Sequence, residues 1–251
     1  MASFNVKHAG IWKRPDVWVK DASVWKKPKQ VFVKDGGVWK PLLWPTLTFI
    51  DLAVVAGQSS AINYGNFVAP TDGLMLVCAH AFGANSRQGS TVSIGGTIVT
   101  PSGRNISDST RKWAVACLAV TAGTYGVTFN LSGSNGANSR NGCGVWLLTN
   151  YLSATAISAN MGYASNSLSA SVGLNLGAYG CAVYLAGEGV RGTPVWSGAS
   201  TDVTKTATVD GFAQTFVAAS KLTAATVTGD VETATWASSN DHNYVVGGAW
   251  Q

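Results

Sequence analysis

The stretch Tyr125-Gly-Val-Thr-Phe-Asn-Leu131 alternates between large apolar residues and small or polar ones at every position. Successive side chains of a β-strand point to opposite faces, so this pattern predicts a strand with one buried and one solvated face. Similar short runs, separated by turn residues, recur along the chain after residue 46. The other runs are Leu47–Ala56, Leu74–Phe82, Thr91–Val99, Trp113–Val120, Gly144–Leu148, Leu168–Leu176, Cys181–Leu185, Thr206–Val209, Leu222–Thr228 and Tyr244–Trp250.

These runs predict an all-β body over residues 46–251, because long stretches with a 3.6-residue apolar period are absent. Roughly 11 to 14 strands in a body of this length favour one large jelly-roll-like β-sandwich. A barrel, or two small sandwiches divided near residues 150–154, is the alternative. One helical turn is predicted at Phe216–Lys221.

The first 45 residues differ from the body in composition. They hold nine of the 17 Lys and Arg residues, three of the 12 Asp and Glu residues, and five of the ten tryptophans. Their net charge is therefore +6, whereas the rest of the chain carries −1. Such a change within one chain predicts two units, an arm over 1–45 and a body over 46–251.

The arm contains a repeat, Gly10-Ile-Trp-Lys-Arg-Pro15, Ser23-Val-Trp-Lys-Lys-Pro28 and Gly37-Val-Trp-Lys-Pro41. Val17-Trp-Val-Lys-Asp21 and Val31-Phe-Val-Lys-Asp35 lie between the copies. Each unit reads as a short strand, a turn and a second short strand, which ends at a proline.

A β-ribbon of this length cannot cover both of its faces, and both carry bulky apolar residues. We therefore predict a docking arm that packs on another protein or on copies of itself. Packing of the arm on its own body is the alternative, and a third interpretation is single-stranded nucleic acid binding, which basic and aromatic residues also suit. The predicted docking residues are Trp12, Trp18, Trp25, Phe32, Trp39 and Trp44.

Tandem Gly-Val-Trp-Lys repeats of this kind resemble those in tail, fibre and head-appendage proteins of tailed bacteriophages and gene transfer agents. The resemblance covers residues 9–44 and departs from the pattern at the Lys-Pro of each copy. A weaker resemblance to β domains of phage structural proteins covers Pro194-Val-Trp-Ser-Gly-Ala-Ser-Thr-Asp202 and the closing Val245–Gln251. These resemblances imply a non-enzymatic virion protein, made in the host cytoplasm, that belongs to a tail fibre, tail tip or head spike.

The sequence predicts no catalytic residue, cofactor or metal. Cys78 and His80 fall on one strand face, but no second ligand pair accompanies them, so both are predicted to be core residues. The Gly187–Gly192 segment matches G-x-G-x-x-G, yet Thr193-Pro-Val-Trp196 follows it in place of a helix, so a hairpin turn is predicted. The apparent strand runs around Cys117, Cys143 and Cys181 predict small core residues.

One motif occurs twice, as Gly83-Ala-Asn-Ser-Arg-Gln-Gly89 and as Gly136-Ala-Asn-Ser-Arg-Asn-Gly142. Both copies read as loops, and Arg and Asn offer fixed donors for sugar hydroxyls or carboxylates. If both loops lie at one end of a sandwich, Asn85, Arg87, Asn138 and Arg140 could bind a glycan. The alternative is the same turn made twice, with solvated arginines.

Three functions follow for comparison. The first is a virion structural protein that docks through residues 1–45 to other virion proteins and projects a body that binds a host glycan or receptor. It is expected to be a homo-oligomer, a ring or a trimer, with no nucleic acid partner and no membrane insertion. A capsid decoration protein or a free lectin-like module is the second, and a polysaccharide hydrolase is the third.

Overall fold

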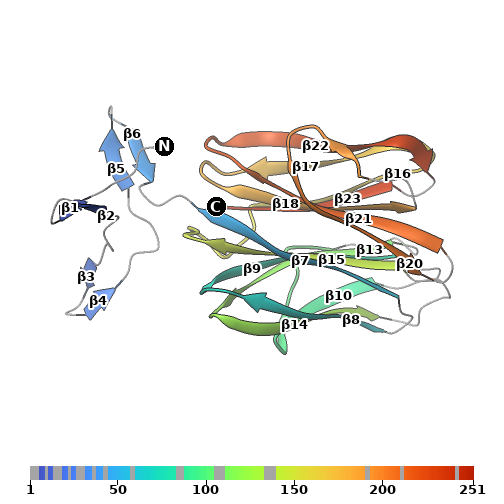
Figure 1. The fold of residues 1–251 in the computed structure, drawn as a ribbon, viewed down its shortest axis with the longest axis horizontal. Helices are drawn as coiled ribbons and strands as arrows, with labels where there is room; N and C mark the ends of the chain where they lie inside the picture. Colours follow the sequence, from blue (N-terminus) through green and yellow to red (C-terminus); the bar gives the residue numbers. More distant parts are fainter. Residues whose placement is uncertain are drawn as a thin grey trace.

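The structure is a computed structural model, which describes the chain except for residues 1–5, 9–10, 14–18, 22–23, 27–31, 36–37, 42–44, 57–59, 83–87, 105–110, 133–139, 190–192, 210–211 and 241–242. Every regular element in the described residues is a β-strand (Figure 1). The all-β class is therefore confirmed. The predicted helical turn at Phe216–Lys221 is wrong, because these residues lie within strand β21, which pairs on both sides.

The arm contains three two-stranded hairpins with one common register. Two residues separate the strands of each hairpin, and a lysine stands opposite a tryptophan at its centre, in the pairs Lys7–Trp12, Lys20–Trp25 and Lys34–Trp39. The repeating unit is therefore Val-Lys-(His or Asp), two residues, then (Ile or Val)-Trp-Lys. The strands are β1 (Val6–His8), β2 (Ile11–Lys13), β3 (Val19–Asp21), β4 (Val24–Lys26), β5 (Phe32–Asp35) and β6 (Val38–Pro41).

The first half of the body, which we call roll 1, spans residues 46–149. Its inner sheet has the order β12-β13-β9-β15-β7, and its outer sheet has the order β11-β10-β14-β8. With β12 set aside as an added edge strand, this is the order of an eight-stranded jelly roll. The strands are β7 (Thr46–Ala56), β8 (Ala61–Ala69), β9 (Gly73–Phe82), β10 (Gln88–Ile94), β11 (Thr97–Val99), β12 (Gly103–Arg104), β13 (Arg111–Val120), β14 (Gly123–Ser132) and β15 (Arg140–Thr149).

The second half, roll 2, spans residues 158–250 and repeats this order. Its inner sheet is β16-β23-β18-β21-β20 and its outer sheet is β17-β22-β19, so the fifth jelly-roll strand is missing from the outer sheet. The strands are β16 (Ser158–Ala164), β17 (Ser167–Leu176), β18 (Cys181–Gly189), β19 (Val195–Trp196), β20 (Ser200–Val209), β21 (Phe212–Leu222), β22 (Val227–Asn240) and β23 (Asn243–Trp250).

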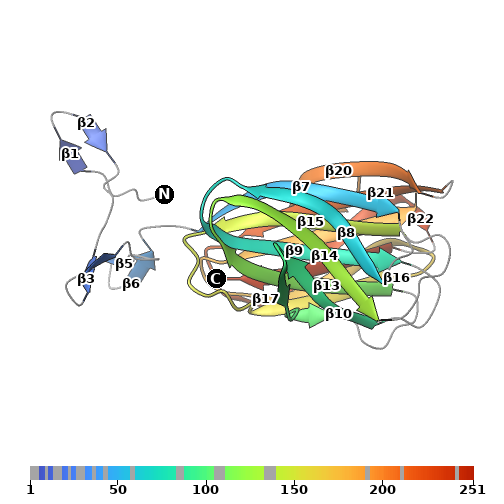
Figure 2. The ribbon, with the colours of Figure 1, turned by 90° about the horizontal axis from the view of Figure 1, so that it is seen from below.

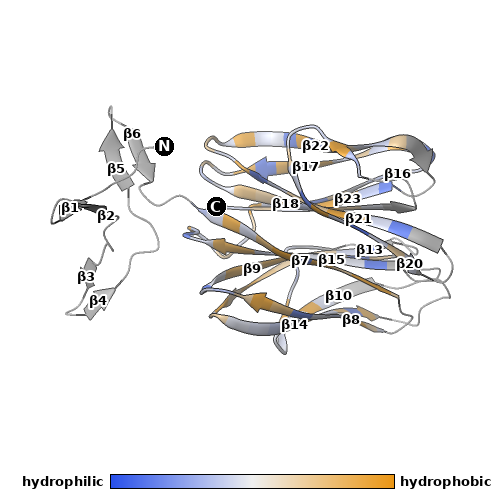
Figure 3. Cartoon of the chain, viewed as in Figure 1, coloured by the Kyte–Doolittle hydropathy of each residue, from blue (hydrophilic) through white to orange (hydrophobic). Residues whose placement is uncertain are grey.

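The two rolls stack as four layers of sheet with three apolar cores between them (Figures 1 and 2). The middle core joins the two inner sheets and contains Trp146 from roll 1 and Trp250 from roll 2. Both inner sheets are therefore buried on both faces, which explains continuous apolar runs such as Leu74–Val77 (Figure 3). Among the side chains that the structure describes, the three cores contain residues from 47 to 250, and we therefore expect the body to fold without the arm.

The all-β sandwich and jelly-roll expectations hold, but the expectation of one large sandwich is wrong, because the body contains two rolls, as in the alternative division near residues 150–154. The strand order reverses across the middle core, where β7 contacts β20 and β21, and β13 contacts β23 and β16. A twofold rotation about an axis parallel to the strands produces this reversal. The two rolls therefore point the same way along that axis.

This arrangement gives the body two distinct ends. At the proximal end, β7 begins at Thr46 next to the arm, and the chain finishes at Gln251. The opposite end is the distal end (Figure 2). The body strands that adjoin a segment outside the described residues all meet that segment at this end. These distal connections span residues 57–60, 83–87, 105–110 and 133–139 in roll 1, and 165–166, 190–194, 210–211 and 241–242 in roll 2.

Candidate functional site

The predicted docking tryptophans occupy equivalent places in the three hairpins. Trp12, Trp25 and Trp39 each stand at the centre of a second strand, opposite a lysine. Phe32 begins β5 opposite Pro41. Equivalent positions in successive hairpins are what a repeated docking contact requires. Two further predicted docking residues lie outside the described part of the chain: Trp18 and Trp44.

Both copies of the Gly-Ala-Asn-Ser-Arg motif belong to the distal end of roll 1. The first copy follows Phe82, the last residue of β9, and the second precedes and includes Arg140, the first residue of β15. Phe82 and Arg140 are direct register partners, so the strand ends that adjoin the two copies are neighbours in the inner sheet. Of the predicted glycan-binding residues, the structure thus places Arg140, and three lie outside the described residues: Asn85, Arg87 and Asn138.

Buried polar side chains concentrate below these connections. The described residues include seven buried polar or charged side chains, and six of them lie within four residues of a distal strand boundary. A polar group in a β-sandwich core costs free energy unless it is hydrogen-bonded, so their gathering at one end marks that end as different from the apolar remainder. The six are His80, Lys112, Asn141, Gln214, Thr215 and Asn243.

His80 joins the two rolls at this end. Its ring stacks on Tyr244 of roll 2, with centroids 3.5 Å apart and planes inclined by 15°. The hydroxyl of Tyr64 donates to the His80 carbonyl over 3.1 Å. Burial raises the pKa of the Tyr244 and Tyr64 hydroxyls well above the ordinary value, so neither is a base near neutral pH. The stack of His80 on Tyr244 therefore connects the two rolls near the distal strand ends.

The cysteines are structural. Burial raises the pKa of Cys78, Cys143 and, to about 12, Cys181, which keeps these thiols protonated and poor as nucleophiles or metal ligands. Cys78 and His80 are both fully buried, as predicted for core residues. Cys117 is half-buried, and its sulfur accepts a hydrogen bond from Trp250 Nε1 over 3.3 Å. Among the described residues, no group of three His, Cys, Asp or Glu could hold a metal ion.

The G-x-G-x-x-G segment is not the predicted hairpin turn. Its first residues end β18 in the inner sheet of roll 2, whereas the next strand, β19, pairs with β22 in the outer sheet. The segment therefore crosses between sheets, as the third-to-fourth connection of a jelly roll does. No described residue after it is helical, so a phosphate site of the strand–helix type has no support here.

Polar contacts also cross the middle core. Trp146 Nε1 of roll 1 donates to the Asp202 carboxylate of roll 2 over 2.8 Å, and Ser220 donates to the other oxygen over 3.0 Å. Burial raises the pKa of Asp202, and these two hydrogen bonds reduce that rise. Lys205 forms a 2.7 Å ion pair with Asp51, and both side chains are exposed. Trp146 is fully buried, so it cannot offer a sugar-stacking surface.

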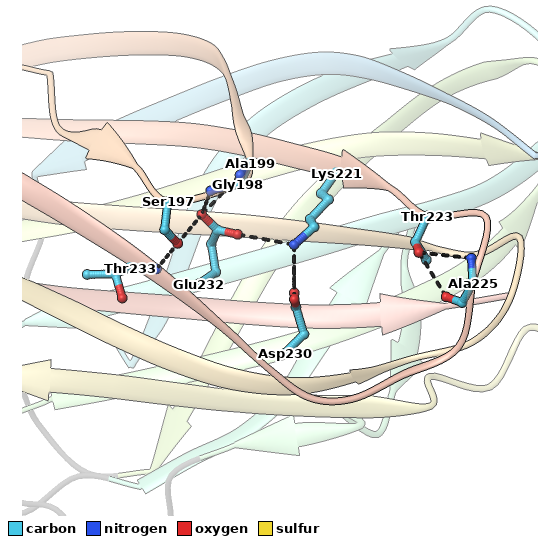
Figure 4. A network of polar contacts seen from close by, with 9 residues as sticks. All are labelled: Ser197, Gly198, Ala199, Lys221, Thr223, Ala225, Asp230, Glu232 and Thr233. Carbon is cyan, nitrogen blue, oxygen red and sulfur yellow. Dashed lines mark hydrogen bonds and ion pairs between the residues drawn. The ribbon is translucent and has the colours of Figure 1, made fainter.

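A carboxylate network that the sequence analysis missed lies in roll 2 (Figure 4). Glu232 Oε1 accepts hydrogen bonds from Ser197 Oγ at 2.9 Å, from the Gly198 amide at 2.6 Å and from the Ala199 amide at 3.0 Å. Lys221 Nζ lies 3.6 Å from Glu232 Oε2 and 2.9 Å from Asp230. The buried Glu232 thus anchors the chain where it leaves the outer sheet after only two strand residues of β19.

A signal for this network was present in the sequence. In Val231-Glu-Thr-Ala-Thr-Trp236, the glutamate falls in phase with Ala234 and Trp236, which are both buried. A charged residue on the apolar face of a strand needs a partner, and here the partners are the backbone amides after Trp196. The network is a structural anchor for the segment Trp196-Ser-Gly-Ala.

The described residues contain no helix long and apolar enough to cross a membrane. No protein-family model, curated protein or solved structure matches this chain.

Proposed function

We propose that this chain is a non-enzymatic structural protein of a virion, which attaches to the particle through residues 1–45 and projects the two rolls toward a host surface. The observation that carries the proposal is that the body has two different ends. The arm joins the body at the proximal end, and the distal connections, with both Asn-Ser-Arg motifs, lie at the opposite end. A protein that links a particle to a surface needs its two contacts at opposite ends.

The three repeated hairpins of the arm support attachment. Its three hairpins share one register, and each is too small to be stable alone. A partner that presents several equivalent surfaces, such as a ring of identical subunits, would match a repeated hairpin with a repeated contact. We therefore infer a symmetric homo-oligomeric setting for the chain, a ring or a trimer. The resemblance of the Trp-Lys repeats to phage appendage proteins favours a virion as that setting.

The body supports projection over catalysis. In the described residues, the buried His80 lies at the joint between the rolls, the buried Glu232 is held by its hydrogen bonds, and the buried thiols are protonated. The distal strand ends belong to both rolls of one four-layer body, and connections at such ends carry the binding residues on other β scaffolds. A capsid decoration protein would also need the arm, but it would not need a binding site at the distal end. Binding of a surface by the distal end would therefore distinguish the proposed function from capsid decoration.

The test is attachment to particles. Particles produced from the encoding genome without this gene are mixed with the purified full chain, with residues 45–251, or with a Trp12→Ala, Trp25→Ala and Trp39→Ala triple variant. We expect only the full chain to co-sediment. The matched control truncates three exposed apolar residues of the body, Val68→Ala, Ile98→Ala and Val195→Ala, and should attach normally. Attachment of residues 45–251 alone would refute the proposal.

A further inference from the structure

The outer sheet of roll 1 presents a face without charge. No Asp, Glu, Lys or Arg occurs in its strands β8, β10, β11 and β14. Alternate residues of these strands lie in the core of roll 1, so the residues between them face outward. They carry hydroxyl, amide or small apolar side chains, and the register places Asn63, Thr128 and Ser93 in one row across three strands. Charged side chains are mostly found on protein surfaces, so an exposed sheet face that has none is unusual.

The outer sheet of roll 2 also presents an uncharged face, although its strands contain two charged residues, Asp230 and Glu232 of β22. Both point inward (Figure 4). Glu232 is 1% exposed, and Asp230 is the register partner of the buried Leu174 and pairs with Lys221. Between them, Val231 points outward and is 60% exposed. A strand with its valine outside and its carboxylates inside reverses the usual preference for burial. This reversal is expected of a strand whose outward face contacts another protein.

Exposed large apolar residues are concentrated on these two sheets. Among the side chains that the structure describes there are eight such residues, and five of them belong to strands of the outer sheets. Exposed apolar residues that gather on one surface mark protein contacts, and the centre of such a contact is depleted in charged residues. Both marks coincide on the outer sheets. The five residues are Val68, Ile98, Leu168, Val195 and Val231.

Each face is large enough for a specific contact. Three or four strands at a spacing of about 4.8 Å, with about ten residues each at about 3.3 Å per residue, form a face on the order of 500 Å². Two such faces bury about 1,000 Å² in total, which is the lower limit for a specific protein interface. Sheets pack face to face with their strands within about 30° of each other. The joint between the two inner sheets is already a contact of this kind.

The two uncharged faces lie on opposite sides of the four-layer body, at its top and bottom in Figure 1. A second copy of the chain therefore supplies, on its own opposite side, a face of the same kind and similar size. A head-to-tail contact covers both faces of every copy with one type of interface, and such contacts form a ring when the rotation closes. Like-to-like contacts need two different interfaces to cover both faces. A second copy in the head-to-tail arrangement is thus the occupant that fits these faces best.

We propose that copies of this chain associate head to tail, with the outer sheet of roll 1 packed on the outer sheet of roll 2 of the next copy. When neighbouring copies keep the strand direction that the two rolls share, all arms leave at one end of the assembly and all distal ends lie at the other. The role of this assembly on a particle rests on the proposed function. The contact itself is a property of the chain and can be measured without particles.

The first experiment is sedimentation equilibrium of the full chain and of its Trp12→Ala, Trp25→Ala and Trp39→Ala variant. The variant separates association through the body from association through the arm. We expect the variant to form dimers and larger species as its concentration rises, because the outer faces remain intact. Since these faces carry no charge, the association should not weaken as salt rises.

The decisive comparison places charges on both faces of that arm variant. Thr128 and Thr233 are partly exposed and lie midway along β14 and β22, which each have a neighbour on both sides. Thr128→Lys with Thr233→Lys should weaken association at least about tenfold, because like charges meet across the contact. Thr128→Lys with Thr233→Glu should weaken it less, because opposite charges then meet. The control, Thr71→Lys with Ala224→Lys, adds two lysines to exposed proximal turns and should change the dissociation constant less than about twofold.

Cross-linking identifies the paired faces without relying on a change of affinity. Thr128→Cys and Thr233→Cys are prepared as separate variants that also carry Cys117→Ser, since the other three cysteines are buried. A short bismaleimide should join the two variants when they are mixed, and it should not join either variant to itself. The control Leu222→Cys, on an exposed side chain near the proximal end, should be joined to neither.

A monomer at every concentration up to about 1 mM, equal losses in the two Thr128 double variants, or cross-linking of one variant to itself would each overturn the inference. These results are separable from the particle test. A chain that attaches through its arm but whose copies do not associate through the body would refute only this contact. Copies that associate head to tail without attaching to particles would refute only the proposed function.

Discussion

Roll 1 and roll 2 have the same strand order but differ at their surfaces. Their inner sheets have equivalent positions in the stack and bury both faces. Their outer sheets have four and three strands, because roll 2 lacks the fifth jelly-roll strand. The inner sheets, which join the rolls, are therefore alike in strand order. The outer sheets, which face solvent, differ. The comparison indicates that the middle core goes with the same strand order in both rolls, whereas the outer sheets differ.

The largest effect is expected for Trp250→Ala, which tests the middle core that the two rolls share. This indole is fully buried in the middle core, and its removal should lower the free energy of unfolding by about 3–5 kcal/mol. Urea denaturation followed by circular dichroism should still show one transition, because each roll exposes an apolar inner sheet without the other. The control Leu222→Ala, on a side chain 56% exposed, should cost under about 1 kcal/mol. Two separate transitions in the wild type would show that the rolls unfold independently and would contradict a shared middle core.

A smaller effect is expected for Glu232→Ala, which addresses the outer sheet of roll 2. The variant leaves two backbone amides and Ser197 without their acceptor, and Lys221 without one of its two acidic partners. We expect a loss of about 2–4 kcal/mol. Amide exchange should rise in Ser197–Ala199 and stay unchanged in roll 1. A uniform rise in both rolls would show that the anchor is not local.

The polar contact between the rolls should matter less. Asp202→Ala removes the acceptor of the Trp146 indole and should cost about 1–3 kcal/mol in thermal or urea unfolding. Asp202→Asn keeps the shape and one acceptor, and should cost less. Because the folded pKa of Asp202 lies above its unfolded value, its ionisation favours the unfolded chain. The wild type should therefore gain stability relative to Asp202→Asn as the pH falls from neutral through that pKa. A relative loss would contradict the assignment.

The smallest effect is expected for Lys205→Gln. Its ion pair with Asp51 also joins the rolls, but both side chains are exposed, 41% and 55%. Exposed pairs contribute little, so the change should stay within about 1 kcal/mol and shrink further in high salt. The matched variant Asp51→Asn should behave alike. A loss comparable to that of Trp250→Ala would mean that charge, and not the apolar core, joins the rolls.

The sequence predicted the inner strands better than the outer ones. Leu74–Phe82 and Cys181–Leu185 are apolar without interruption because neighbouring sheets cover both faces, and such runs stand out. Strand β8 was missed, because one face is polar and Gly65 at φ 93° accompanies a register shift. The predicted strand Leu222–Thr228 is wrong, since it spans the turn between β21 and β22.

The division into two rolls was left open by the sequence for a physical reason. Runs of apolar and polar residues report how each strand is buried, but the order of strands within a sheet depends on contacts between distant residues. The candidate site was predicted in part for the same reason. The repeated Asn-Ser-Arg motif was visible in the sequence, whereas the neighbouring placement of its two copies needed the pairing of Phe82 with Arg140. Glu232 was detectable from its phase with Trp236, and its amide partners were not.

Strand β7 has a mechanical consequence. It is an edge strand of the inner sheet, its first residue follows the arm, and it pairs with β15 along nearly its whole length, from Thr46 to Ala56. A pull between an anchored arm and a tethered distal end runs along this strand. The load then falls in shear on all the hydrogen bonds of the ladder together, whereas a pull across the strands would open them one after another like a zipper. The point where the arm enters thus gives the molecule its strongest direction of resistance.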